Sequence, residues 1–368
     1  MNVDVELTAR QDVPAWLTYG TPVFTVVAAL LVSSIALVAL GVDPIGAYST
    51  MFLDPWTSQF GISNVLEKSV PLILAGLAVY LPLRAGLWNI GATGQLYIGA
   101  IVGTWIGLNV SLPSILLIPL MLVVAGIGGG LWGFIPGYLR AKWGVNEIIV
   151  SLLIAYAAIR INGYMVRGPM QGGLGNFPQS AILPLGAQLP EIPVLGAHVG
   201  FLVALLMMGA VYVLVKRTRI GYEITFVGAN PAAAQQAGMK SSLIYILVFV
   251  IGGALAGMAG VIEIAGIQNR LRPEFSPGYG FTAIPIALLG RNGAIQVFIA
   301  ALFFGLLFVG GTALEISYSV PAALVDVIQA LIILFLITAE FFKRFAVDIT
   351  VNLSGTSGPT TTPVEEGD

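Results

Sequence analysis

Residues 85–139 read AGLWNIGATGQLYIGAIVGTWIGLNVSLPSILLIPLMLVVAGIGGGLWGFIPGYL, and this stretch contains no Asp, Glu, Lys or Arg. A helix needs about 20 mostly apolar residues to cross a hydrocarbon core about 30 Å thick. The stretch is therefore long enough for two crossings, with a turn predicted at residues 109–113. The sequence predicts a protein that is embedded in a membrane.

The composition of the whole chain agrees with this prediction. Its 368 residues are 57% hydrophobic and only 9% charged, whereas soluble domains carry about 25% charged residues. The net charge of -2 gives no reason to expect a nucleic acid partner. Without cysteine, and with His198 as the single histidine, the chain offers no cysteine or histidine cluster for a metal.

Further apolar segments alternate with polar ones along the chain. We expect an all-α, polytopic transmembrane helical bundle of about 8–10 spans, some of them short or broken. Residues 281–290 are apolar but too few to cross, because ten helical residues reach only about 15 Å. Residues 86–94 are interrupted by glycines. A pair of interrupted segments is typical of a transport pathway.

The distribution of charge predicts the domain organisation and the orientation. We expect a cytoplasmic N-terminal arm at residues 1–18, a permease domain at residues 19–345, and a disordered cytoplasmic tail at residues 346–368. If residues 281–290 count as a crossing, most basic residues fall on one side, as the positive-inside rule requires. We therefore predict a multi-pass protein of the cell membrane with both termini in the cytoplasm.

A polar, glycine-rich stretch opens the uncharged region. Uncharged amides and a hydroxyl suit a neutral polar solute, and glycine lets the backbone approach a ligand closely. Helix packing through small residues explains the same pattern, so both interpretations stay open. The candidate residues for a translocation path are Asn89, Gly91, Thr93, Gly94 and Gln95.

A long polar loop at residues 216–241 contains a predicted short helix. Asn230-Pro231 is a helix start signal, and Gly238 is a helix end signal. Such a small-sided helix can dock into a groove of a cytoplasmic partner, whereas a simple connector needs no helix capped at both ends. The candidate coupling residues are Gly221, Glu223, Gly228, Asn230, Pro231, Ala233, Ala234 and Gly238.

Residues 252–260, GGALAGMAG, carry two pairs of small residues spaced four apart. The pairs are Gly253 with Gly257 and Ala256 with Gly260. This spacing lets two helices approach closely. We interpret it as a packing surface rather than a ligand site.

Three segments together with the coupling loop resemble the permeases of the branched-chain amino acid, ribose and nucleoside importer superfamily, and most closely its nucleoside-type branch. The segments are residues 85–100, residues 135–148 (IPGYLRAKWGVNEI) and residues 275–292, which contain GYGF and ALLGRN. The resemblance covers roughly residues 65–342. The N-terminal arm and the acidic tail have no part in it.

The resemblance implies the permease subunit of an ATP-driven ABC importer, which forms the translocation path for nucleosides or related sugar-like solutes. Such a subunit is not an enzyme and binds no cofactor; ATP binds a partner subunit. The implied partners are cytoplasmic ATP-binding subunits, a second permease and an extracytoplasmic solute-binding protein, within membrane lipid. The sequence contains no Gly-x-x-x-x-Gly-Lys-Ser/Thr phosphate loop, which agrees with a subunit that does not itself bind ATP.

Other classes of function fit the sequence less well. A membrane enzyme would need a nucleophile, a metal site or paired carboxylates, and no such cluster is present in the sequence. An ion-coupled secondary transporter of a small polar solute is the alternative. It would place acidic residues in the middle of its spans, and this chain has few there.

Overall fold

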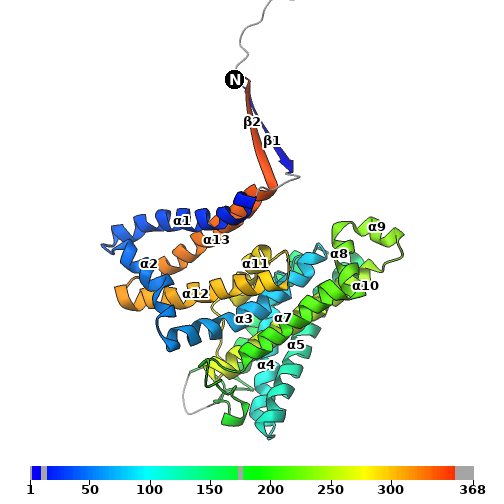
Figure 1. Cartoon of the computed structure of the whole chain (residues 1–368). Helices are drawn as coiled ribbons and strands as arrows, with labels where there is room; N and C mark the ends of the chain where they lie inside the picture. Colours follow the sequence, from blue (N-terminus) through cyan, green and yellow to red (C-terminus); the bar gives the residue numbers. More distant parts are fainter. Residues whose placement is uncertain (1, 10–14, 173–176, 353–368) are drawn as a thin grey trace, which may run out of the picture. The chain divides into compact units, whose positions relative to one another are not determined.

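The computed structural model describes residues 2–9, 15–172 and 177–352. Within these residues the chain forms thirteen α-helices and two strands (Figure 1). It divides into two compact units: residues 34–329, and residues 1–33 together with residues 330–368.

The larger unit is a helical bundle. Its α-helices are α2 (Pro44–Phe52), α3 (Gln59–Arg84), α4 (Ala92–Asn109), α5 (Ser114–Trp143), α6 (Glu147–Arg167), α7 (Gly200–Arg217), α8 (Arg219–Ala229), α9 (Pro231–Gln236), α10 (Ser241–Glu263), α11 (Tyr279–Leu289) and α12 (Ala294–Tyr318). Three short elements join them: the 3-10 helices η1 (Asp54–Trp56) and η2 (Leu185–Ala187), and the π-helical η3 (Ile264–Gln268). The helices α1 (Ala15–Ala39) and α13 (Ala322–Arg344) each belong partly to both units.

Seven helices of the described chain are long and apolar enough to cross a membrane: α3, α5, α6, α7, α10 extended by η3, α12 and α13. This confirms the prediction of a polytopic helical bundle, although seven is fewer than the 8–10 spans expected. The difference lies in three helices. The apolar part of α1 and the whole of α11 are shorter than the others, and α4 begins with the polar sequence ATGQ, which lowers its mean hydropathy.

The helix α10 packs against α3, α4 and α5. Its small residues make the contact with α5, as the spacing of Gly253 and Gly257 predicted. A Cβ atom on Gly253 would meet the carbonyl oxygen of Gly129, and one on Gly257 would meet that of Ala125. The two backbones therefore approach so closely that any larger residue would force the helices apart.

The smaller unit contains a two-stranded antiparallel ribbon that the sequence analysis did not predict. Strand β1 (Asn2–Ala9) pairs with β2 (Phe345–Asn352), and Asn2 lies opposite Asn352. Apolar and polar residues alternate throughout NVDVELTA and from Val347 onward in FAVDITVN, a pattern that favours strands. The prediction of a disordered tail from residue 346 is therefore wrong for the residues of β2. Residues 353–368 of that tail lie outside the described residues.

The two ends of the bundle carry different structures. The helices α8 and α9 lie between α7 and α10 at one end, which we call the α9 end (Figure 1). There Arg84, the last residue of α3, donates a hydrogen bond to Thr225 of α8 at 3.1 Å. At the opposite end, which we call the cavity end, Leu189 N donates to the Ala265 carbonyl at 2.9 Å. This bond ties the segment before α7 to the chain that follows α10.

Candidate functional site

The α9 end consists of two short helices, each capped by its own sequence. Thr218 accepts a hydrogen bond from Gly221 N at 3.1 Å at the start of α8. Asn230 accepts one from Ala233 N at 3.0 Å, with Pro231 as the first residue of α9. The predicted short helix is thus confirmed, because a side-chain oxygen satisfies an otherwise unpaired amide at a helix start. The helix α8 was not predicted.

The helix α9 is held on the bundle by one buried alanine. The side chain of Ala234 is fully buried in an apolar cluster with Ile224 and Val227 of α8 and Ile244 and Val248 of α10. The opposite face of α9 is exposed, and it carries small and amide side chains: Ala232, Gln235 and Gln236. This arrangement presents a rigid, small-sided surface at the end of the bundle.

Two glycines bring α8 into close contact with its neighbours. A Cβ atom on Gly228 would meet the carbonyl oxygen of Arg84, and one on Gly221 would meet that of Leu214 at the end of α7. Glu223 binds Arg219 on the same helix at 2.8 Å. All the candidate coupling residues therefore lie together at the α9 end, including Gly238, which follows α9 in a left-handed conformation with φ +80.

The candidate path residues gather around the start of α4, and two of them form a closed amide pair. Asn89 Nδ2 donates to Gln95 Oε1 at 2.9 Å, and Gln95 Nε2 donates to Asn89 Oδ1 at 3.1 Å. Asn89 Nδ2 also donates to the Ala78 carbonyl at 3.2 Å. Both amides are fully buried. Reciprocal bonding of this kind satisfies buried polar groups and fixes the turn between α3 and α4.

The other three candidate path residues contact neighbouring helices. The positions of Gly91 and Gly94 lie against Ser151 and Ala155 of α6, respectively. Thr93 is buried, and its hydroxyl has no hydrogen-bond partner among the described residues. None of the candidate path residues lines the cavity at the opposite end. Their role in translocation stays a prediction.

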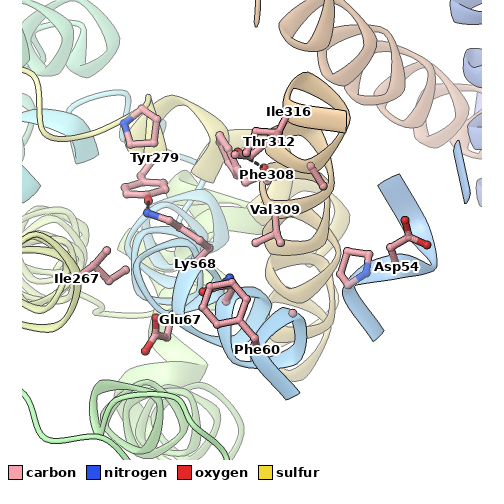
Figure 2. A pocket seen from close by; sticks show the side chains of 15 residues that line it. Asp54, Phe60, Glu67, Lys68, Ile267, Tyr279, Phe308, Val309, Thr312 and Ile316 are labelled. Atoms are coloured by element: carbon pink, nitrogen blue, oxygen red, sulfur yellow. Dashed lines mark hydrogen bonds between the residues drawn. The ribbon is translucent and has the colours of Figure 1, made fainter. Parts of the chain in front are cut away.

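A cavity of about 650 Å³ opens at the cavity end between η1, the first half of α3, the start of α11 and the end of α12 (Figure 2). Phe60 and Phe308 contribute aromatic rings to its wall. The polar groups in the wall are few, and they come from Asp54, Asn64, Glu67, Lys68, Tyr279 and Thr312. Apolar walls with a small number of polar groups are typical of sites for small molecules.

Lys68 connects this cavity to the interior of the bundle. Its ammonium nitrogen lies 3.3 Å from the Tyr279 hydroxyl (Figure 2). The same nitrogen lies 3.5 Å from Glu263 Oε1. The Lys68 side chain is 34% exposed, whereas that of Glu263 is 0% exposed. Gln268 Nε2 donates to the same Glu263 oxygen at 2.9 Å and to the Phe275 carbonyl at 2.6 Å. Together these bonds join α3, α10, η3 and α11.

A histidine lies beside the cavity. The backbone N of His198 donates to Glu67 Oε1 at 3.3 Å. The His198 side chain is buried, and neither ring nitrogen has a hydrogen-bond partner among the described residues. Burial lowers the pKa of His198 to about 4, because a charged imidazolium would lose its hydration. The ring is therefore neutral near pH 7.

None of the residues that line the cavity was predicted from the sequence as a site residue. One local signal was present: Glu67 and Lys68 are adjacent charges inside the otherwise uncharged first half of α3. Ionisable residues within a membrane span are costly and are by default functional candidates. The other lining residues belong to segments far apart in the sequence, so no local pattern joins them.

Comparison with known proteins identifies relatives along almost the whole chain. A model of the family described as Branched-chain amino acid transport system / permease component matches residues 61–337. Glucose ABC transporter permease protein TsgB13 of Haloferax volcanii is 56% identical over 98% of this chain and 97% of its own length. Guanosine ABC transporter permease protein NupP of Bacillus subtilis is 33% identical over 88% of this chain and 94% of its own length.

A third relative, Nucleoside ABC transporter permease protein NupB of Lactococcus lactis, is 31% identical over 86% of this chain and 89% of its own length. No solved structure matches the chain. All three relatives are named as ABC transporter permeases, while the solutes in their names differ.

Proposed function

The chain belongs to the branched-chain amino acid transport system permease family, as an ABC transporter permease of the simple-sugar and nucleoside type, and on that premise we propose that it carries a neutral, hydroxyl-bearing solute into the cell. It is a multi-pass membrane protein and a transport subunit, not an enzyme. In this class of transporter, ATP binds partner subunits.

The observation that carries the choice of solute is the cavity between α3, α11 and α12. Its volume of about 650 Å³ accommodates a monosaccharide or a nucleoside. The rings of Phe60 and Phe308 offer apolar faces to a flat sugar or base. Asn64, Thr312 and Lys68 offer hydrogen bonds to hydroxyl groups. Glucose is the first solute to test, because the relative named for it is 56% identical to this chain.

The α9 end is proposed as the contact with the ATP-binding subunits. The exposed face of α9 is small-sided, and the caps and the buried Ala234 hold the helix in place. A rigid element of this kind transmits a movement of the partner to α7 and α10, which it connects. This proposal includes the predicted coupling residues and the coupling loop at residues 216–241.

The proposed orientation places the α9 end and both termini in the cytoplasm. Arg84, Arg140 and Lys142 end α3 and α5 on the α9 side, as expected for cytoplasmic ends. The pairing of β1 with β2 brings the two ends of the chain together, so they share one side of the membrane. The basic pair at residues 343–344 favours the cytoplasmic side for them. The cavity end then faces outward, where a solute-binding protein would deliver the solute.

The proposal is tested by purifying the tagged protein from its native membrane in mild detergent. Co-purification of an ATP-binding subunit and a second permease is the expected result. The complex, reconstituted in liposomes with its solute-binding protein, is then expected to take up labelled glucose or nucleoside only when ATP is supplied. A protein that purifies alone and transports under an ion gradient would instead be a secondary transporter.

A further inference from the structure

The charges around the cavity are unequal in number. Among the described residues, Lys68 is the only cationic residue in the cavity wall, and the wall also contains two acidic residues, Asp54 and Glu67. Glu263 lies directly behind Lys68. The cavity wall and the layer directly behind it therefore hold three carboxyl groups and one ammonium group. Among the residues that the structure describes, neither Asp54 nor Glu67 forms a salt bridge.

The positive charge of Lys68 compensates a carboxylate that is buried in the interior of the bundle. Glu263 is fully buried, and its Oε2 atom has no hydrogen-bond partner within the described part of the chain. A carboxylate taken out of water is costly unless a cation compensates it. The Lys68 ammonium lies 3.5 Å from the other oxygen, Oε1. Lys68 therefore still offers hydrogen bonds to the cavity, while its charge is neutralised from behind.

This arrangement leaves the cavity with a negative potential. A cleft lined by one sign of charge within low-dielectric walls focuses the field, raises the concentration of cations and lowers that of anions. The mostly apolar wall of the cavity supplies such a boundary. The hydroxyl-binding groups can thus be reached by a neutral solute, whereas a phosphate or carboxylate group on the same solute is repelled.

We propose that the Lys68–Glu263 pair determines specificity by making the outer cavity reject anionic solutes, so that a free sugar or nucleoside enters and its phosphorylated form does not. This inference rests on the proposed function, since it assumes that the cavity lies on the solute pathway. Glu263 acts through Lys68 and does not touch the solute. Glu263 is therefore a positioning residue, and Glu67 is a direct contributor to the field.

The chain contains no cysteine, which allows the potential to be measured directly. A single cysteine is introduced at position 312 in the cavity wall, and a control cysteine at position 111, which is exposed between α4 and α5. The full-length permease, purified with its partner subunits, is treated with cationic trimethylammonioethyl or anionic sulfonatoethyl methanethiosulfonate. Mass spectrometry of the peptide that contains each position gives the rate of modification.

The expected result is a cation-to-anion rate ratio at position 312 that is about tenfold higher than at position 111. Glu67→Gln should lower this ratio severalfold. Glu263→Gln removes the charge that neutralises Lys68, so it should lower the ratio at position 312 at least as far as Glu67→Gln does. Neither substitution should change the ratio at position 111.

Equal ratios at the two positions in the otherwise unaltered chain would overturn the proposal. So would a ratio at position 312 that neither substitution changes. If Glu263→Gln fails to fold, Glu67→Gln alone decides between these outcomes, because its side chain lies at the cavity surface. Thiol modification requires neither ATP nor transport. A failure of glucose or nucleoside uptake would therefore reject the proposed function without altering the measured potential.

Discussion

The α9 end and the cavity end differ in how the sequence specifies them. The α9 end is built from about twenty consecutive residues, 218–238, whose helix caps form within this segment, while Gly228 packs against Arg84 at the end of α3. The cavity end is built from side chains between Asp54 and Ile316, contributed by elements that meet only after folding. Local chemistry can therefore be recognised in a sequence, whereas a site assembled from distant segments leaves at most isolated signals such as the Glu67-Lys68 pair.

The largest effect is expected from Gly228→Trp at the α9 end. Because a side chain at this position meets the backbone of Arg84, α8 must move away from the end of α3. We expect ATP-dependent uptake to fall to about one-tenth or less, while ATP hydrolysis by the complex continues. Uptake and hydrolysis are measured on the same proteoliposomes.

Gly209→Trp is the matched control, because Gly209 in the middle of α7 has no neighbouring atom within 4 Å of its Cβ position. It should leave uptake unchanged. If the Gly228→Trp protein took up solute normally, α8 would have no part in coupling. The proposed difference between the α9 end and the cavity end would then not hold.

Asn89→Leu and Gln95→Leu test whether the amide pair packs or lines a path. Each substitution leaves one buried amide without its partner, which costs about 1–3 kcal/mol in folding stability. If the pair only packs, the double variant should lose less folding stability than the two single variants lose together, because it leaves no buried amide without a partner. Thermal unfolding of the purified protein measures these losses.

The solute KM separates the two roles of the amide pair. An unchanged KM with lowered stability would mean that these residues serve packing. A raised KM in a protein of normal stability would place them on the path and extend the functional site from the cavity end to the start of α4.

The cavity end should respond to pH through His198. In the folded protein the pKa of His198 is about 4, whereas the ordinary pKa of histidine is 6.5. Between these values the unfolded chain binds more protons, so stability falls as pH falls. The loss between pH 7 and pH 5 is about 2 kcal/mol by this linkage. His198→Gln, compared with the unaltered protein by thermal unfolding, should remove that part of the pH dependence. Identical pH profiles would show that the ring is not buried in solution.

The smallest effect is expected from Asn230→Ala, which removes the cap of α9. Loss of an N-cap side chain costs about 1 kcal/mol. Asn146→Ala is the matched control, because Asn146 caps α6 through Ile148 N at 2.9 Å. The two variants should lose similar stability in thermal unfolding, while only Asn230→Ala lowers the ratio of solute transported to ATP hydrolysed. If the ratio of solute transported to ATP hydrolysed were the same in both variants, the N-cap of α9 would not be needed for coupling.

The two strands and the helix α8 show the limits of pattern reading in a membrane protein. The alternation in residues 347–352 is a strand pattern, but so short a segment next to a Ser- and Thr-rich tail gave no reason to expect a partner strand more than 300 residues earlier in the sequence. The helix α8 was not predicted, because its sequence, RIGYEITFVGA, is too polar to cross and lies within the predicted loop.

The sequence by itself determined the membrane class, the helical bundle, the resemblance to importer permeases and the capped helix α9. Each of these depends on composition or on residues close together in the chain, because hydration and local hydrogen bonding act between such residues. Only the tertiary structure decided that Asn89 and Gln95 bond to each other, that Lys68 meets Glu263 across 195 residues, and that a cavity lies beside them. Those contacts follow from how the helices pack, and packing depends on all the helix surfaces at once.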